Sequence, residues 1–403
     1  MRLKDITIFS PQYVGDNIDG DVSFVPMESL RNGTIDYKTI PLLKAKGKYT
    51  YFGNQDLLIA KVTPCFENGN IAIARNLLNG IGFGSSEIFV LRPNKEVISQ
   101  YLFYLSQSRD FQDKACATMC GVGGLKRISP LFMRTYEFDM PSIENQQRMV
   151  TYLDTKLSDI DHQVSLLTSK RDAYLRLKKS IINHAVTRGL NPNVKMKDSG
   201  IEWIGEVPEH WEVKRMKDIF FERKELSLTG EEDLLSVSEF YGVARRKDKM
   251  NSDEEFESRA DSLVGYKICK AHDLVINIML AWKTGLGISD NDGIVSPAYA
   301  VYEGRNIASH FYHYLLRSGM YVKEFKRHSK GIIDSRLRLY NDRFNNISAI
   351  YPPLPEQRVI ATYLDDKCAK IDTIVSNLDK QISRYADVKR SLIDEVITGK
   401  RAV

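Results

Sequence analysis

The sequence predicts an α+β protein in which two globular mixed α/β domains are joined by two long helices that form an intramolecular antiparallel coiled coil with a pseudo-twofold axis. Three observations support this prediction: a heptad helix ends the chain, a copy of that helix lies near the middle, and a globular stretch precedes each copy. At 403 residues the chain is also longer than most single domains, so more than one folded unit is expected.

The closing helix is defined by its heptad pattern. Apolar residues recur at alternating spacings of four and three, with Lys389 at the one polar position, through Leu364, Cys368, Ile371, Val375, Leu378, Ile382, Tyr385, Leu392 and Val396. A helix with such a seam buries it against a partner helix.

The partner helix lies in the same chain. The segment Thr151–Asp154 recurs as Thr362–Asp365, that is, 362 − 151 = 211 residues later. We call this spacing of 211 residues the duplication offset, and the match continues at this spacing without a gap as far as Thr187 and Thr398. A gapless match of this length indicates duplication. The residues predicted to form the coil and its partner-binding surface are Leu153, Leu157, Ile160, Val164, Leu167, Tyr174 and Ile181 in the first copy, and Leu364, Ile371, Val375, Leu378, Ile382, Tyr385 and Leu392 in the second.

The two helices divide the chain into five parts. We predict a first globular domain at 1–142, a first long helix at 143–190, a connector at 191–214, a second globular domain at 215–352 and a second long helix at 353–403. A first helix from Gln146 to Thr187 would be roughly 60 Å long at a rise of 1.5 Å per residue. The connector contains Trp203 and Trp211, so we expect it to be pinned to a surface instead of forming a free linker.

The first globular domain is predicted to contain a sheet followed by a helix. Short apolar runs typical of strands, separated by glycine-containing turn signals at 52–54 and 80–84, stand at 56–60, 70–74 and 87–91. The next apolar run predicts a helix from Tyr101 through Phe111. A flexible glycine loop at 121–124 then precedes the basic segment Leu125–Ile128.

The second globular domain repeats this plan loosely. Arg215–Ile219 resembles Arg2–Ile6, and Asp273–Ile276 resembles Asp56–Ile59. The helices are close copies, whereas the globular domains share only a skeleton. The sequence therefore indicates one scaffold built twice that carries two different recognition elements.

This duplication has a geometric consequence. An antiparallel pair of duplicated helices has a pseudo-twofold axis, as in a symmetric dimer, and would place the two domains at opposite ends of a stiff rod. Duplex DNA presents the same groove to the same side once per helical turn, about every 34–36 Å. The predicted form therefore suits a two-part DNA site.

Motifs for catalysis and cofactor binding are missing from the sequence. There is no GxxxxGK[ST] phosphate loop, Gly82–Glu87 lacks the last glycine of a dinucleotide-binding turn, and no Asn-Pro-Pro-aromatic stretch of an amino-methylating enzyme occurs. Cys116 and Cys120 lack a second pair of zinc ligands, and His310 and His313 are predicted to pack along a helix. We therefore expect a non-catalytic chain with no cofactor or metal of its own.

The composition is that of an ordinary soluble protein from a reducing compartment. The chain has five scattered cysteines and a net charge of +5, a mild positive charge that is compatible with nucleic acid. It has no apolar run long enough to span a membrane and no signal peptide at its start. We expect a cytoplasmic protein that binds no membrane.

Basic residues near glycine loops are the candidates for DNA contacts. Arginine suits guanine edges and phosphates, whereas lysine mostly suits phosphates. Such residues occur at comparable places in both halves of the chain. The candidate set comprises Lys44, Lys46, Lys48, Lys126, Arg127, Arg245, Arg246, Lys247, Lys283, Arg327, Lys330, Arg336 and Arg338.

With these features together, the chain resembles the specificity (S) subunits of type I restriction–modification systems. The resemblance covers nearly the whole chain, and the residues that carry it are Pro353–Arg358 leading into Ala361–Asp365, Lys178–Ile182, and the connector from Lys197 to Trp211. Two features depart from it. The first domain lacks its own copy of the tryptophan-containing connector, and Ser142–Gln146 stands where the second helix has Pro353–Gln357.

The resemblance implies a function in defence against phage. In this family two target-recognition domains each bind one half of a split double-stranded DNA site, and the two helices fix the spacer and dock two methylation (M) subunits. S-adenosylmethionine, ATP and Mg²⁺ are expected on partner subunits, because M subunits methylate adenine at N6 and two restriction (R) subunits, where present, add an ATP-dependent endonuclease. The S subunit itself performs no bond chemistry.

Two other classes of function are alternatives to this interpretation. One is a nuclease or methyltransferase that acts alone, and the other is a stand-alone coiled-coil scaffold or regulator that binds proteins without specific DNA recognition.

The polar position shared by Lys178 and Lys389 is where we expect a departure from a plain coil, with both side chains facing the M subunits instead of the partner helix.

Overall fold

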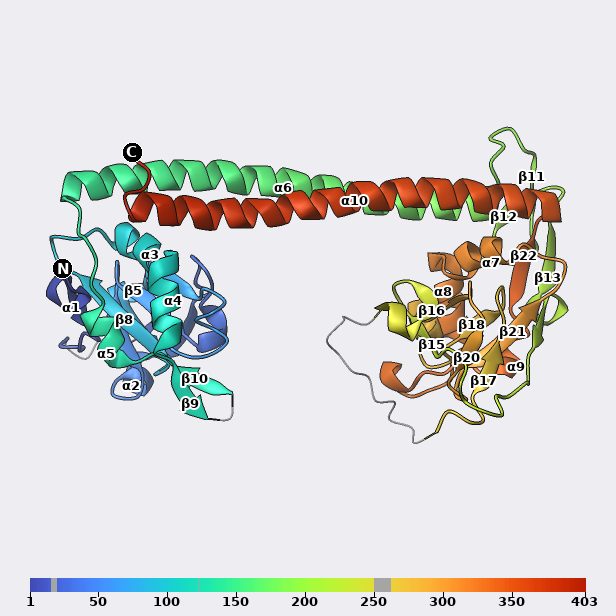
Figure 1. The fold of residues 1–403 in the computed structure, drawn as a ribbon, viewed down its shortest axis with the longest axis horizontal. Helices are drawn as coiled ribbons and strands as arrows, with labels where there is room; N and C mark the ends of the chain where they lie inside the picture. The colour runs from blue at the N-terminus through green and yellow to red at the C-terminus, as the bar shows by residue number, and fades with distance from the viewer. Residues whose placement is uncertain (16–19, 123, 250–261) are drawn as a thin grey trace. The chain divides into compact units, whose positions relative to one another are not determined.

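The computed structural model describes residues 1–403 except 16–19, 123 and 250–261 (Figure 1). The chain divides into two compact units: unit 1 comprises Met1–Ser169 and Leu378–Val403, and unit 2 comprises Lys170–Asn377. Two long helices, α6 (Ile143–Arg188) and α10 (Leu354–Ile397), each contribute one part to either unit. Each unit therefore contains a globular part and a pair of helix segments.

Unit 1 is built on an antiparallel four-stranded sheet. Its order is β1-β8-β5-β6, with bounds Thr7–Phe9, Ile88–Pro93, Leu57–Ala60 and Ile71–Ile73. The central strand β5 is buried at all four positions, because Leu57 and Ile59 face one hydrophobic core whereas Leu58 and Ala60 face another. The strands predicted from the three apolar runs are confirmed.

The assignment of residues 52–54 and 80–84 to turns is largely wrong. Most of these residues belong to β4 and β7 in a second sheet of order β3-β2-β7-β4, with bounds Lys38–Pro41, Asp21–Val25, Ile81–Gly84 and Thr50–Gly53. The glycines serve close packing here, since a Cβ on Gly82 would lie 2.1 Å from the ring of Phe52. The same glycine therefore looks like a turn signal in the sequence and acts as a strand residue in the fold.

The helix predicted from Tyr101 through Phe111 is interrupted. Ser108 has an extended conformation, and its Oγ accepts a hydrogen bond from the Phe111 N–H at 3.4 Å. The serine thus ends one helix and caps the next. The helices and the hairpin of the globular part are α1 (Leu3–Ile6), α2 (Leu42–Ala45), α3 (Ser99–Gln107), α4 (Arg109–Ala117), β9 (Cys120–Val122), β10 (Leu125–Arg127) and α5 (Pro130–Thr135), with short 3-10 turns η1 (Met27–Ser29) and η2 (Leu78–Gly80).

Unit 2 repeats the main sheet strand for strand. The order β14-β21-β18-β19 is again antiparallel, with bounds Phe220–Glu222, Ala300–Gly304, Leu274–Ile276 and Leu286–Ile288. Two helices follow as in unit 1, α7 (Ser309–Leu316) and α8 (Gly319–His328). The predicted common skeleton is therefore confirmed.

The other strands of unit 2 form two-stranded sheets. They are β11 (Met196–Asp198) with β12 (Glu206–Pro208), β13 (Glu212–Arg215) with β22 (Ser348–Tyr351), β15 (Leu235–Ser238) with β16 (Gly242–Arg245), and β17 (Lys267–Cys269) with β20 (Gly293–Val295). The remaining helical elements are η3 (Met216–Asp218), η4 (Arg246–Lys249), η5 (Ala281–Lys283), η6 (Asp334–Arg336) and α9 (Asn341–Phe344).

The segments of α6 and α10 run antiparallel within both units. In unit 1 Lys389 Nζ lies 2.7 Å from Asp161 Oδ1, and in unit 2 Lys178 Nζ lies 2.6 Å from Asp372 Oδ1. The two ion pairs are equivalent, because Asp372 and Lys389 are the copies of Asp161 and Lys178 at the duplication offset. Both units therefore have the same helix register. The expectation that these lysines face away from the partner helix is wrong, because the duplication also supplies an aspartate opposite each lysine.

The predicted seam residues lie along the inner faces of the two helices. None of the fourteen is exposed; Leu153, Leu157, Leu364, Ile371, Leu378 and Leu392 are buried, and the others are partly buried. The ends of the helices also join the globular cores, through Leu153 and Val396 in unit 1 and through Val186 and Leu364 in unit 2. Each core therefore includes both helices.

The connector is pinned to unit 2, as expected. Trp211 is fully buried, and its Nε1 donates a hydrogen bond to Glu356 at 3.0 Å. Trp203 packs edge-on against Tyr321 of α8, with ring centroids 5.0 Å apart. Two aromatic anchors thus fix the connector to α10 and to the globular part.

Candidate nucleic-acid interface

In unit 2 a basic loop is attached to the end of the central strand β18. The Leu339 N–H donates a hydrogen bond to the Ile278 carbonyl at 2.9 Å. Lys330 and Arg338 exchange two backbone hydrogen bonds of 3.0 Å, which close residues 330–338 into a loop. We call this segment the 330–338 loop. The sheet therefore positions it through main-chain bonds that are independent of its side chains.

The 330–338 loop and the neighbouring η5 form a positive surface. The ammonium groups of Lys283 and Lys326 lie 4.9 and 5.0 Å from the centre of the Trp282 ring. Lys326 is paired with Asp334 of the loop at 3.0 Å, whereas Lys330, Arg336 and Arg338 are exposed and their side chains form no ion pair with the described residues. Exposed cations without a carboxylate partner are suited to binding phosphate.

Unit 1 has a counterpart of this loop in the β9–β10 hairpin. The Ile128 N–H donates to the Lys61 carbonyl at 3.0 Å, and the duplication offset maps Ile128 onto Leu339. Arg127 maps onto Arg338, but it forms a bidentate ion pair with Glu87 at 2.9 Å. The two loops thus have the same attachment and different charges. Of the glycine loop predicted at 121–124, Gly123 lies outside the described residues, and Gly121 and Val122 belong to β9.

Several predicted contact residues are already neutralised. Arg245 and Lys247 both pair with Asp233, at 3.3 and 2.8 Å, and Arg327 pairs with the buried Glu324 at 2.5 Å. Each of these side chains would have to give up a carboxylate to bind DNA. In unit 2 the structure therefore brings together four of the predicted residues: Lys283, Lys330, Arg336 and Arg338. Arg246 is partly buried after β16. In unit 1 the exposed Lys44, Lys46 and Lys48 lie on and beside α2, and Lys126 lies on β10.

Sequence reasoning missed the residues that hold each globular part to its helix. Gln146 Oε1 accepts a hydrogen bond from the Ile98 N–H at 3.0 Å, and its Nε2 donates to two backbone carbonyls at 3.0 Å. The duplicate Gln357 accepts from the Ala308 N–H at 2.8 Å and donates to the Pro352 carbonyl at 2.7 Å. Both glutamines are fully buried. Their match at the duplication offset was the available signal.

A tyrosine–aspartate bond strengthens each of these attachments. Tyr104 donates to Asp154 at 2.5 Å in unit 1, and Tyr314 donates to Asp365 at 2.7 Å in unit 2. Burial and then the nearby carboxylate raise the pKa of both phenols, so both remain protonated donors at neutral pH. The orientation of each globular part on its helix is therefore fixed by matching polar contacts.

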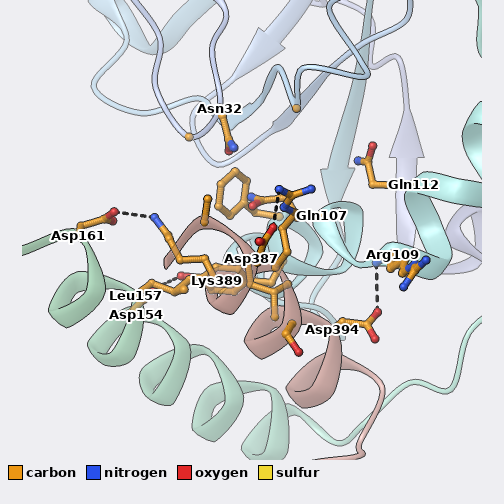
Figure 2. Close-up of a pocket in the computed structure, with 18 of the residues that line it drawn as sticks. Asn32, Gln107, Arg109, Gln112, Asp154, Leu157, Asp161, Asp387, Lys389 and Asp394 are labelled. Carbon is orange, nitrogen blue, oxygen red and sulfur yellow. Dashed lines mark hydrogen bonds and ion pairs between the residues drawn. The ribbon is translucent and has the colours of Figure 1, made fainter. Parts of the chain in front are cut away.

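A polar cleft of about 1430 Å³ lies beside the attachment in unit 1 (Figure 2). Figure 2 shows Lys389 reaching across to Asp161, and Asp394 accepting a hydrogen bond from the Arg109 N–H, at 3.1 Å. These bonds join the two helices to each other and to the start of α4. Among the described residues no group of three or more His, Cys, Asp or Glu side chains is placed to hold a metal ion.

The two histidines of α7 differ in their surroundings. His310 is partly exposed and lies 3.3 Å from Asp290. His313 is a packing residue, as predicted: its Nδ1 accepts the Ile288 N–H at 3.3 Å, and burial lowers its pKa to about 3. It is therefore neutral in the folded protein at any pH near neutrality.

The buried His313 should make unit 2 less stable in acid. Its pKa is lower in the folded state than the ordinary value of about 6.5, so the unfolded state binds the proton first. Stability is then complete above pH 6.5 and falls toward pH 3, by up to about 1.4 kcal/mol per pH unit. All three tryptophans lie in unit 2, so urea unfolding followed by tryptophan fluorescence measures this unit.

Variants of the two histidines test this prediction. His313→Gln keeps an acceptor for the Ile288 N–H and should flatten the loss of stability between pH 6.5 and 4.5, whereas the matched control His310→Gln should follow the wild type. An equal loss in wild type and His313→Gln over this range would contradict the assignment.

These features define a class of protein with two similar α/β parts, each attached to an antiparallel helix pair and each bearing a loop with exposed cations. The chain belongs to the family of type I restriction modification DNA specificity domains, whose model matches residues 8–166 and 208–384. No helix in the described part of the chain is long and apolar enough to cross a membrane.

Curated relatives bear the same description. The type I restriction enzyme EcoAI specificity subunit of Escherichia coli is 29% identical over 184 residues, which are 45% of this chain and 31% of that protein. The MjaVIII specificity subunit of Methanocaldococcus jannaschii is 21% identical over 404 residues, which are 96% of this chain and 88% of that protein. The chain thus matches less than a third of the length of the E. coli relative and most of the M. jannaschii one.

Two solved structures share the fold. One is a chain from a structural study of how the type I R-M system assembles and changes conformation. It has a TM-score of 0.76 at 15% identity, and the match covers 100% of this chain and 97% of that chain. The HsdS subunit from Thermoanaerobacter tengcongensis has a TM-score of 0.55 at 14% identity, covering 100% and 96%. At these identities the likeness is one of fold.

Proposed function

We propose that this chain is the DNA sequence-recognition subunit of a type I restriction–modification complex, and that each globular part binds one half of a two-part DNA site. The observation that carries the proposal is that the two units share one duplicated framework but have loops of different charge. The main sheet, the helix register and the loop attachment are the same in both units, whereas Arg127 in one unit is paired with Glu87 and its counterpart Arg338 in the other forms no ion pair with the described residues. Such a frame suits a site whose halves differ in sequence.

In this proposal the long helices set the spacer between the half-sites and dock two M subunits. The M subunits bind S-adenosylmethionine and methylate adenine at N6. Two R subunits, where present, add an endonuclease that uses ATP and Mg²⁺. The chain itself is non-catalytic, and its membership of the DNA specificity family supports this division of labour.

The proposal is tested by expressing the chain with an M subunit from the same host. We expect the two to co-purify and to methylate adenine within a split motif, which sequencing of modified bases would detect. Exchange of residues 215–352 for those of another specificity subunit should change one half of the motif and leave the other half unchanged. A change in both halves would contradict the modular arrangement.

The same material separates the alternatives. The isolated chain should give no product with DNA and S-adenosylmethionine or Mg²⁺, and a product would instead indicate an enzyme that acts alone. A complex that assembles but binds all DNA sequences equally, or none, would indicate a protein scaffold.

A further inference from the structure

The turn between β15 and β16 presents an aromatic ring to solvent. β15 ends at Ser238 and β16 begins at Gly242. Phe240 in this turn is 91% exposed, whereas unit 2 buries most of its other large aromatic side chains. A phenylalanine ring gains free energy when a partner covers it. The hydrogen bonds that anchor the turn distinguish Phe240 from an apolar side chain that is exposed by chance.

Arg317 of α7 anchors this turn. Its Nη2 donates to the carbonyls of Glu239 and Phe240, each at 3.0 Å, and its Nη1 donates to the carbonyls of Thr284 and Leu286, each at 2.7 Å. Burial lowers the pKa of this guanidinium. Four charge-assisted bonds to the main chain leave the turn little freedom.

The turn is also fitted closely to the helix beneath it. The Phe240 N–H donates to Ser238 Oγ at 3.1 Å. Gly242 has φ +85°, and a Cβ at this position would lie 3.0 Å from the His313 ring. A residue with a side chain would therefore strain the backbone and press on α7. The fold therefore holds the main chain at Phe240 in place, and the ring contacts solvent.

A lysine lies beside the turn that carries the ring. Thr284 Oγ1 donates to the Glu239 carbonyl at 2.7 Å, which places Lys283, the residue before Thr284, beside the turn. Lys283 and Lys326 both lie over the Trp282 ring, and of the two only Lys326 is paired with a carboxylate of the described residues, that of Asp334 at 3.0 Å. A solvent-exposed ring next to cations matches the chemistry of nucleic acid, which offers apolar base faces between phosphates.

We propose that Phe240 is a fixed wedge that stacks its ring on the bases of the half-site bound by unit 2. This inference rests on the proposed function and deepens it by naming a contact to the bases. Apolar side chains that enter a groove can partly unstack a base step and bend the duplex. Pyrimidine–purine steps deform most easily, so such a wedge would favour half-sites that contain one. The anchored turn serves the contact, because a main chain that is already ordered loses little entropy on binding.

The test uses the chain assembled with M subunits and duplexes that carry 2-aminopurine at successive positions of the half-site. Binding of the wild-type complex should raise the fluorescence at one step. Phe240→Ala should abolish this rise and weaken binding at least about 5-fold, as loss of a base–aromatic stack does. Phe240→Trp should restore both. The matched control Leu228→Ala removes another apolar side chain of unit 2, 89% exposed, and should behave as the wild type.

The outcomes distinguish this proposal from the proposed function. If Phe240→Ala binds the two-part site with wild-type affinity and fluorescence, the wedge is refuted and the recognition function stands. If Phe240→Ala prevents assembly with the M subunits, the ring contacts protein and the wedge is again refuted. If the wild-type complex binds no two-part site, the proposed function itself fails.

Discussion

Replacement of Lys330, Arg336 and Arg338 with glutamine is expected to weaken binding of the assembled complex to its DNA site on the order of 100-fold, since three charge-assisted contacts of roughly 1 kcal/mol each multiply. These side chains are exposed and form no ion pair with the described residues. The fold should survive the change, because main-chain bonds at Lys330, Arg338 and Leu339 close and attach the loop.

The salt dependence of binding separates phosphate contacts from general attraction. Loss of three phosphate contacts should make the negative slope of log K against log salt shallower by about 3. The matched control replaces Lys197, Lys217 and Lys224 with glutamine. These lysines are exposed and form no ion pair with the described residues, so the control removes the same charge from the connector, from η3 and from the segment after β14. If this control weakens binding as much as the loop variant, the loop has no specific place in the interface.

Gln146→Ala is expected to cost unit 1 about 2–4 kcal/mol, because it leaves the part-buried Ile98 N–H and two part-buried carbonyls without their partner. The glutamine is fully buried, and its three bonds to the main chain are all about 3.0 Å long. Urea unfolding followed by circular dichroism would measure the loss. Hydrogen exchange at the Ile98 amide, which donates to Gln146, should rise in the same variant and locate the effect at the attachment.

The neighbouring Gln147 supplies the control for this prediction. It follows Gln146 directly in α6 but is exposed, so Gln147→Ala should change stability by less than about 0.5 kcal/mol. In the assembled complex, Gln146→Ala should also impair recognition of the half-site bound by unit 1 more than that of the other half-site. Equal effects of Gln146→Ala and Gln147→Ala on stability would show that the buried bonds do not hold the globular part in place.

The sequence predicted the helices well because their pattern is local and repeated. The seam from Leu364 to Val396 requires only a regular spacing, and the copy at the duplication offset supplies its own partner. The strands around Leu57 and Val90 were equally clear, because continuous apolar runs mark strands that are buried on both faces. The second sheet of unit 1 was missed because Gly82 and Gly84 suggest turns until Phe52 is seen packed against them.

The candidate interface shows the limit of the same reasoning. The sequence placed cations beside glycine loops in both halves, but it could not separate Arg338, which has no ion-pair partner among the described residues, from Arg127, which is paired with Glu87. Glu87 lies far from Arg127 along the chain, so only the folded sheet brings the two charges together. The anchoring of Phe240 by Arg317 has the same origin, since its four acceptors come from two segments that are far apart in the sequence.

The sequence by itself determined the duplicated plan, the antiparallel helix pair and the family resemblance, because each depends on spacing along one chain. Only the tertiary structure decided that Lys178 and Lys389 pair across the coil, that Gln146 and Gln357 fasten the globular parts, and which cations remain unpaired. The physical reason is that burial and charge neutralisation depend on neighbours in space. A heptad pattern indicates which face of a helix is apolar, whereas the net charge of a surface depends on every carboxylate that folding brings close to it.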